Sequence, residues 1–303
     1  GRYAESFLNL VTTNYAGWLQ PGQSQYAFLL TPDGAVVDDL MVYRRSRDHF
    51  LLVVNAANAS KDWDWLSAIN SGKVLLDPDR PWVEPDGPVT LRDLRGDNPD
   101  ALVDIALQGP WSRALLERLL TGPDRHRLTS LRRAEFCELS VDGVPVLCAR
   151  TGYTGEPLGY EILVSPAQTM RLWTTLLAAD KERNLQPIGL AARDSLRTEA
   201  GLPLYGHELA GSHEILPHEA GFAPYVKLHK PAFVGRSAYL RAVAGWTREV
   251  VRFSIPAGQR PVRAGTPVVD KGGQVVGWVT SCVVLETGQV GMALLSVRGL
   301  GEG

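Results

Sequence analysis

The sequence predicts an α+β protein with more than one domain. Short strand-like runs alternate with helix-like runs up to about residue 247, and a proline-rich stretch at residues 75–89 divides them into two parts. From Arg248 onward, short β-rich runs separated by Gly and Pro predict a small β-barrel or sandwich. The chain has 303 residues, 45% of them hydrophobic and 21% charged, and is therefore long enough for two or three domains.

The first part is predicted to contain three strands and a helix. The strands are expected at residues 25–30, 35–43 and 49–54. These runs are rich in apolar residues, and the sequences TPDG and RRSRD between them are typical of turns. A helix is expected in NAANASKDWDWLSAIN, which begins with capping residues and places Trp63, Leu66 and Ile69 at helical spacing.

The second part, from about residue 105, is predicted to alternate strands with helices. The expected strands are DIALQG, AEFCELS, VPVLCARTG and YEILV, and the expected helices are PWSRALLERLL and PAQTMRLWTTLLAA. A further helix in GLAARDSLRTEAG is expected to end at Gly201, because glycine commonly occupies the first position after a helix.

The composition argues against several classes of protein. A net charge of -2 without a dense basic run argues against nucleic acid as a partner. Cys137, Cys148 and Cys282 form no C-x-x-C pair, so neither a disulfide framework nor a zinc site is indicated, and a reducing compartment is expected. No run approaches the roughly 18 apolar residues of a membrane span. The chain begins without Met, as a trimmed chain would.

Two adjacent carboxylates, Asp38 and Asp39, lie inside the predicted strand GAVVDDLMVYRR. Successive side chains of a strand face opposite ways, so Asp39 shares a face with Val37 and Met41, while Asp38 shares the other with Leu40. Whichever face is buried, one carboxylate lies among apolar side chains, and burial raises its pKa unless cations or donors compensate. From these residues alone, a structural aspartate and a functional site are equally well supported.

Other motifs supply further candidate residues. RTGYTGEPLGYEI lacks the ending of a phosphate-binding loop, and its Glu161 lies next to apolar residues of a predicted strand. In LAARDSLRTEAG, Asp194 can pair with Arg197, which leaves Arg193 either on the surface or in need of another anion. HELAGSHEILPHE holds three His-Glu pairs, but their spacing does not fit a metal site, and a polar loop is expected. These residues are compatible with a pocket for a small polar, partly aromatic ligand.

Three stretches, TPDGAVVDDLMVY, RTGYTGEPLGYEI and GLAARDSLRTEAGLPLYGHEL, resemble the core motifs of the aminomethyltransferase family, the T-protein of the glycine cleavage system. They occur in the family's order, and LQPGQSQYAFLL, LLVVNAAN, ALQGP, HEAGFAPYVK and GWVTSC resemble its lesser landmarks. The resemblance implies a multi-domain cloverleaf of α/β folate-binding subdomains followed by a C-terminal β-barrel-like domain. On this basis we expect a folate-binding region at residues 1–247, its N-terminal part missing, and a truncated β domain at residues 248–303.

The resemblance also implies an activity, in which a one-carbon unit passes from the aminomethyl-lipoyl arm of the H-protein to tetrahydrofolate and ammonia is released. By position in the motifs, Asp39 is expected to be the catalytic carboxylate near folate N5. Glu161 is expected to bond the pterin edge, and Arg193 to contact folate. The residues expected to line the pocket are Tyr26, Val53 and Asn55. No metal or membrane is expected, and the expected location is the cytoplasm, or the mitochondrial matrix in a eukaryote.

Two alternative functions use the same fold. Related folate-dependent demethylases take one-carbon groups from methoxy, sulfonium or N-methyl donors, but GLAARDSLRTEAGLPLYGHEL is closer to the aminomethyltransferase form. Non-enzymatic folate-binding proteins that support iron–sulfur or tRNA-modifying enzymes carry a K-G-C-Y-x-G-Q-E run. The corresponding region here, HKPAFVGRSAYL, has no Cys, which argues against that class.

Overall fold

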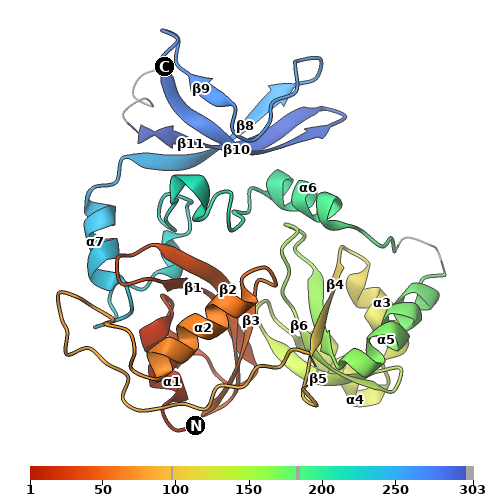
Figure 1. The fold of residues 1–303 in the computed structure, drawn as a ribbon. Helices are drawn as coiled ribbons and strands as arrows, with labels where there is room; N and C mark the ends of the chain where they lie inside the picture. Colours follow the sequence, from red (N-terminus) through yellow and green to blue (C-terminus); the bar gives the residue numbers. More distant parts are fainter. Residues whose placement is uncertain (97, 182–184, 298–303) are drawn as a thin grey trace. The chain divides into compact units, whose positions relative to one another are not determined.

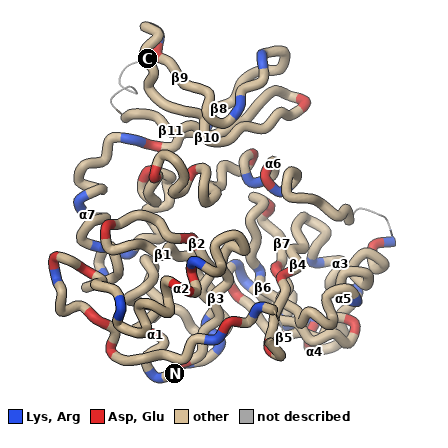
Figure 2. Tube along the Cα trace, in the orientation of Figure 1, with Lys and Arg blue, Asp and Glu red and all other residues tan. Residues whose placement is uncertain are grey.

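The computed structural model describes residues 1–96, 98–181 and 185–297, which form two compact units (Figure 1). Unit 1 consists of residues 1–20, 25–90 and 194 onward, and unit 2 of residues 21–24 and 91–193. Helices and strands are mixed in both units, so the predicted α+β class is confirmed. Basic and acidic residues are interspersed along the trace of each unit (Figure 2).

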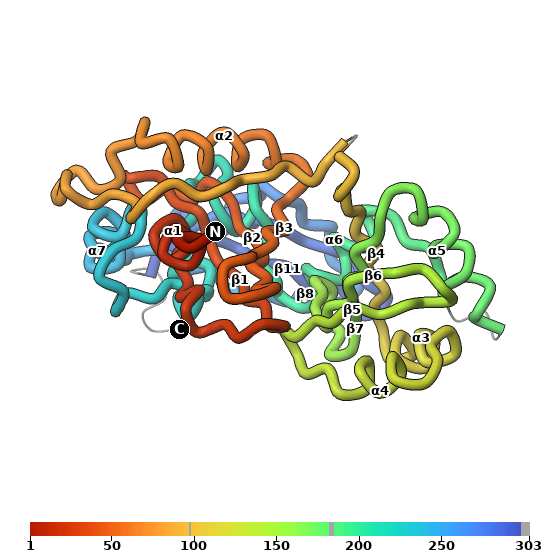
Figure 3. The backbone as a smooth tube through the Cα atoms, turned by 90° about the horizontal axis from the view of Figure 1, so that it is seen from below, coloured from red at the N-terminus to blue at the C-terminus, as the bar shows by residue number. Residues whose placement is uncertain are grey.

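The first sheet of unit 1 has the strand order β1-β2-β3. Its strands are β1 (Gln23–Leu30), β2 (Val36–Ser46) and β3 (His49–Val54), which confirms the three predicted strands. Thr31 N donates to Ala35 O (2.9 Å) in the turn between β1 and β2, and Gly34 there has a φ of 88° that favours glycine. The predicted helix, α2 (Ala59–Asn70), lies alongside this sheet (Figures 1 and 3).

Short helices of unit 1 were not predicted. They are α1 (Ala4–Val11), α7 (Arg236–Ala244) and the 3-10 turns η1 (Ala16–Trp18), η2 (Gly211–His213) and η3 (Ala223–Tyr225). Helix α1 buries Phe7, Leu8, Leu10 and Val11. With eight residues it has only about two turns, too few for a helical period to be recognised in the sequence.

The C-terminal strands of unit 1 form an antiparallel sheet of order β8-β11-β10-β9. They are β8 (Arg248–Pro256), β9 (Pro267–Val269), β10 (Val275–Leu285) and β11 (Gly288–Ser296). Within the described residues the sheet is open, with β8 and β9 as its edges, so the expectation of a barrel-like domain was wrong in this respect. Leu294 and Val250 of this sheet share a hydrophobic cluster with Phe28 and Leu30 of β1.

Unit 2 is built on a sheet of order β4-β7-β6-β5, with the helices on one face. Its elements are β4 (Val103–Gln108), α3 (Ser112–Leu119), α4 (Gly122–Ser130), β5 (Phe136–Val141), β6 (Val144–Ala149), β7 (Gly159–Val164) and α5 (Pro166–Ala179). Alternate residues such as Ile105, Leu107 and Ile162 form one core with Leu116 of α3 and Leu172 of α5. Helix α4 was not predicted, because it buries only Leu128 and lacks an apolar face.

The predicted helix before Gly201 is confirmed as α6 (Leu190–Ala200), and Gly201 follows it with a φ of 69°. The division between the two units falls inside this helix, after Arg193. The separate β domain expected from residue 248 stays a prediction. Within the residues that the structure describes, no helix has both the length and the apolar composition needed to cross a membrane.

Candidate active site

Asp39 is held by two side-chain donors in unit 1. The Tyr26 hydroxyl donates to Asp39 Oδ2 (2.9 Å), and Asn55 Nδ2 donates to Asp39 Oδ1 (2.9 Å). Each carboxylate oxygen therefore accepts at least one hydrogen bond, while the side chain itself is only partly buried. The structure thus brings together three of the residues that the sequence singled out.

Val53 lies on the same face of the sheet as Asp39. Met41 of β2 pairs with Val53 of β3, and Asp39 and Asn55 each lie two residues away from one member of this pair. Because side chains of a strand alternate between faces, Asp39, Met41 and Val53 point to the same side. Asn55 follows the end of β3, and its amide nitrogen reaches both Asp38 and Asp39. Asp38 points to the other side, where it is fully buried.

Four aromatic side chains form what we call the aromatic wall: Tyr26, Phe28, Phe222 and Tyr225. The Tyr26 ring makes edge contacts with Phe28 (5.1 Å between centroids), Phe222 (5.6 Å) and Tyr225 (4.9 Å). The sequence analysis did not single out Phe222 or Tyr225. The only signal for them was the landmark HEAGFAPYVK, in which both occur. Phe28 is fully buried, while the other three rings are partly exposed and adjoin the Asp39 carboxylate through the Tyr26 hydroxyl.

Burial raises the pKa of Asp39 to about 6, and the neighbouring charge of Asp38 adds to this effect. The hydrogen bonds from Tyr26 and Asn55 oppose it, because they stabilise the ionised form. Asp39 is therefore mostly ionised at pH 7 yet close enough to its pKa to exchange a proton. A carboxyl group with these properties is suited to general base chemistry near neutral pH.

We expect Tyr26→Phe to raise the pKa of Asp39 above about 6, because the variant loses a donor that stabilises the carboxylate. The measurement is a pH titration of the Asp39 carboxyl signal by carbon NMR. Tyr225→Phe is the matched control, since it also removes a hydroxyl from the aromatic wall but not one bonded to Asp39. Equal midpoints in Tyr26→Phe and the wild type would contradict this assignment.

Glu161 and Arg193, the other two predicted site residues, belong to unit 2. Glu161 lies on β7 opposite Ala106 of β4, and its carboxylate accepts a hydrogen bond from the Thr151 hydroxyl. The Arg193 guanidinium lies over the ring of Tyr153, with 4.9 Å from Cζ to the ring centroid. Both side chains are partly buried, and their roles toward folate stay predictions.

The predicted pairing of Asp194 with Arg197 is confirmed, with 2.6 Å between Nη2 and Oδ1. Arg197 is also fully buried, a feature that the sequence analysis missed. Its guanidinium pairs with Glu208 (2.6 Å) and donates to Ser281 Oγ of β10 (2.8 Å). The expected polar loop HELAGSHEILPHE thus supplies buried structural anions, since Glu219 there also pairs with Arg248 (2.9 Å).

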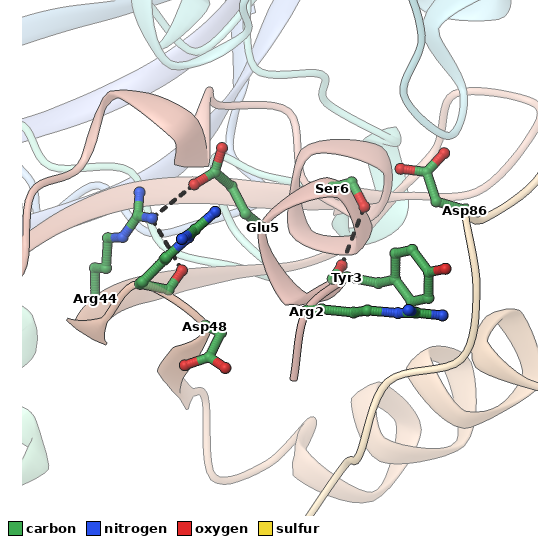
Figure 4. A pocket seen from close by; sticks show the side chains of 8 residues that line it. Arg2, Tyr3, Glu5, Ser6, Arg44, Asp48 and Asp86 are labelled. Atoms are coloured by element: carbon green, nitrogen blue, oxygen red, sulfur yellow. Dashed lines mark hydrogen bonds and ion pairs between the residues drawn. The ribbon is translucent and has the colours of Figure 1, made fainter.

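A cavity of about 540 Å³ in unit 1 is lined by charged residues near the N-terminal end (Figure 4). There Arg44 forms an ion pair with Glu5 (2.7 Å) and donates to Arg47 O (2.9 Å). Neither Asp39 nor Tyr26 lines this cavity, so it is separate from the candidate active site. In the described part of the chain, no group of three or more His, Cys, Asp or Glu residues is arranged to hold a metal ion.

Comparison with known proteins agrees with this fold. The family model of the GCVT N-terminal domain matches residues 1–230. The aminomethyltransferase of Desulfitobacterium hafniense (strain Y51) is 39% identical over 282 residues, which cover 93% of this chain and 70% of that protein. The aminomethyltransferase of Chlorobium chlorochromatii is 38% identical over 297 residues, covering 98% and 75% respectively.

A solved structure is similar over almost the whole chain. The crystal structure of glycine cleavage system aminomethyltransferase T from Bartonella henselae superposes with a TM-score of 0.76 at 30% identity, and covers 98% of this chain and 74% of that one. The fold, together with these relatives, defines a one-carbon transferase. More particularly, the chain belongs to the aminomethyltransferase family of the glycine cleavage system, the T-proteins.

Proposed function

We propose that this aminomethyltransferase moves a one-carbon unit from the aminomethyl-lipoyl arm of the H-protein to tetrahydrofolate, with release of ammonia. The observation that carries the proposal is the Asp39 carboxylate, held by Tyr26 and Asn55 next to the aromatic wall. An anchored carboxylate beside aromatic rings suits a flat heterocycle that carries a basic nitrogen. Tetrahydrofolate is such a molecule.

The residues of unit 1 fit tetrahydrofolate in two respects. Three rings of the aromatic wall, those of Tyr26, Phe222 and Tyr225, are partly exposed and offer edges and faces against which a pterin can pack. Asn55 uses its amide nitrogen for both aspartates, while its side-chain oxygen Oδ1 accepts no hydrogen bond from the described residues, so Oδ1 is available to a donor on the ligand. Tetrahydrofolate would supply the nitrogen that takes up the transferred carbon.

Asp39 would act on the nitrogen that takes up the carbon. As a carboxylate it can accept the proton that this nitrogen must lose, or offset the positive charge that develops at the carbon during transfer. We further propose that Glu161 accepts hydrogen bonds from the amide and amine edge of the pterin, because a carboxylate can accept two such donors at once. Arg193 is proposed as a second contact to folate.

A comparison of donors tests the proposal. The protein is incubated with tetrahydrofolate and, in separate reactions, with aminomethylated H-protein or with methoxy, sulfonium and N-methyl donors. We expect 5,10-methylenetetrahydrofolate and ammonia from the H-protein reaction only. Methyl transfer from one of the small donors, without product from H-protein, would instead assign the chain to the related demethylases. Binding of tetrahydrofolate without transfer from any donor would assign it to the non-enzymatic folate-binding proteins.

A further inference from the structure

Asp62 in the first turn of α2 is a buried acid whose two carboxylate oxygens have no donor. The residue is 1% exposed, and neither carboxylate oxygen accepts a hydrogen bond from any of the described residues. An ionised carboxylate in this position would be costly, because buried charges need a counter-ion or hydrogen-bond donors. Lys61, the preceding residue of α2, uses its ammonium group for Val37 O (2.5 Å) and the Tyr205 hydroxyl (2.7 Å).

Asp62 lies on the face of α2 that is turned toward Asp38 of β2. Asn58, one helical turn before Asp62, accepts a hydrogen bond from Asp62 N and donates its Nδ2 to Asp38 Oδ1, and the Asp38 carboxyl acts directly on Asp62. Asp38 is fully buried and already accepts hydrogen bonds from Asn58 Nδ2 (2.6 Å), Asn55 Nδ2 (3.0 Å) and Asn55 N (3.3 Å). Two carboxyl groups can bond each other only if one of them carries a proton. Because Asp38 already accepts three hydrogen bonds and Asp62 accepts none from the described residues, the shared proton is assigned to Asp62, which donates it to Asp38.

The pKa of Asp62 agrees with this geometry. Burial raises it to about 8, and the hydrogen bond and negative charge of Asp38 act in the same direction. Lys61 lowers it and Asp39 raises it further, so the charged groups around Asp62 are Asp38 and Asp39 from β2 and Lys61 from its own helix. Asp62 is therefore a neutral hydrogen-bond donor at pH 7.

Asn55 connects this acid pair to Asp39. Its side-chain nitrogen faces three acceptors, Asp38 Oδ1 (3.0 Å), Asp39 Oδ1 (2.9 Å) and Asp39 O (3.1 Å), but carries only two hydrogens. Asp38 and Asp39 thus compete for one amide group. A proton donated to Asp38 by Asp62 offsets part of the charge of Asp38. The hydrogen bond from the Asn55 amide to Asp38 is weaker as a result.

We propose that Asp62 is a positioning residue for Asp39: as a neutral acid bonded to Asp38, it leaves the Asn55 amide available to hold the Asp39 carboxylate. This rests on the proposed function, in which Asp39 acts on tetrahydrofolate. Loss of the Asp62 proton adds a second negative charge next to Asp38 and draws the amide away from Asp39. The Asp39 carboxyl then loses a donor and holds its proton more tightly.

The test compares Asp62→Leu, Asp62→Asn and the wild type in kcat/KM for tetrahydrofolate from pH 5.5 to 9.5. Asp62→Leu removes the donor, and we expect kcat/KM at pH 6.5 to fall about three- to tenfold, the effect of one hydrogen bond. Asp62→Asn keeps an N–H donor that cannot ionise, so it should recover part of this loss. The wild-type value should fall above about pH 8 as Asp62 ionises, and this fall should be absent in Asp62→Asn.

Asp64→Asn, an exposed acid on the same helix, is the control and should behave as the wild type at every pH. The Asp39 midpoint, read by carbon NMR without substrate, should rise in Asp62→Leu, and it reports on positioning even if the proposed function fails. An unchanged midpoint in folded Asp62→Leu would overturn the proposal. The proposal would also be overturned if the alkaline fall in kcat/KM persisted in Asp62→Asn. The same holds if the Asp62 variants lowered the melting temperature without altering the pH profile of kcat/KM. If the midpoint shifts but the wild type transfers no carbon, the proposed function is what fails.

Discussion

Asp39→Asn is expected to lower kcat for one-carbon transfer by about 10² to 10⁴, the range typical of losing a general base. The variant keeps the shape of the side chain and a hydrogen-bonding oxygen, but it can neither accept a proton nor offset positive charge. Asp33→Asn, an exposed acid in the turn before β2, serves as the control and should leave kcat unchanged. A kcat for Asp39→Asn within about threefold of the wild type would contradict a catalytic role.

The free energy of unfolding of Asp39→Asn distinguishes a loss of catalysis from a loss of folded protein. The pKa of Asp39 is raised by folding, so the folded state binds more protons than the unfolded state between about pH 4 and pH 6. Stability contributed by this group therefore falls as the pH rises through that window and stays low above it. At pH 7 we expect Asp39→Asn to be at least as stable as the wild type, measured by urea unfolding.

Arg197→Met is expected to destabilise the protein by about 3–5 kcal/mol, the usual cost of removing one partner of a buried ion pair. Arg197 and Glu208 are both fully buried, and Glu208 Oε1 has no hydrogen-bond partner among the described residues even in the intact protein. The substitution leaves the charge of Glu208 without its counter-ion. It also removes the hydrogen bond to Ser281 of β10, which connects α6 to the C-terminal sheet.

Two further variants make the Arg197 prediction specific, with the free energy of unfolding in urea as the measurement. Arg241→Met removes an ion pair with Asp79 whose side chains are more than half exposed, and should cost less than about 1 kcal/mol. The double variant Arg197→Met, Glu208→Leu removes both buried charges and should recover part of the loss. A cost for Arg197→Met no larger than that of the exposed pair would contradict the assignment.

Local patterns predicted much of unit 1. Alternation along the strand separated Asp38 from Asp39 and placed Asp39 on the face with Met41, as the burial along β2 confirms: Asp38 and Leu40 are buried, while Asp39 and Met41 are partly exposed. The three-residue spacing of Asp194 and Arg197 predicted their ion pair. Each of these inferences needs only the geometry of one strand or one helix, which the sequence carries directly.

What the sequence analysis missed depends on distant parts of the chain. The aromatic wall combines Tyr26 with Phe222 and Tyr225, almost 200 residues later, and no local period connects them. In the sequence, Asp62 is an ordinary polar residue in the first turn of a helix. Only the fold brings it close to Asp38. The C-terminal strands were predicted as β structure, but whether they close into a barrel depends on their pairing, which their composition does not determine.

The pH dependence of kcat/KM for tetrahydrofolate, measured with aminomethylated H-protein as donor, tests the role of Asp39 most directly. This parameter reports the ionisation of the free enzyme. Since the pKa of Asp39 is raised to about 6, we predict that kcat/KM rises with pH through about 6 and then levels before the fall assigned to Asp62. A value that stays constant from pH 5 to 7.5, or a rise that persists unchanged in Asp39→Asn, would contradict the account.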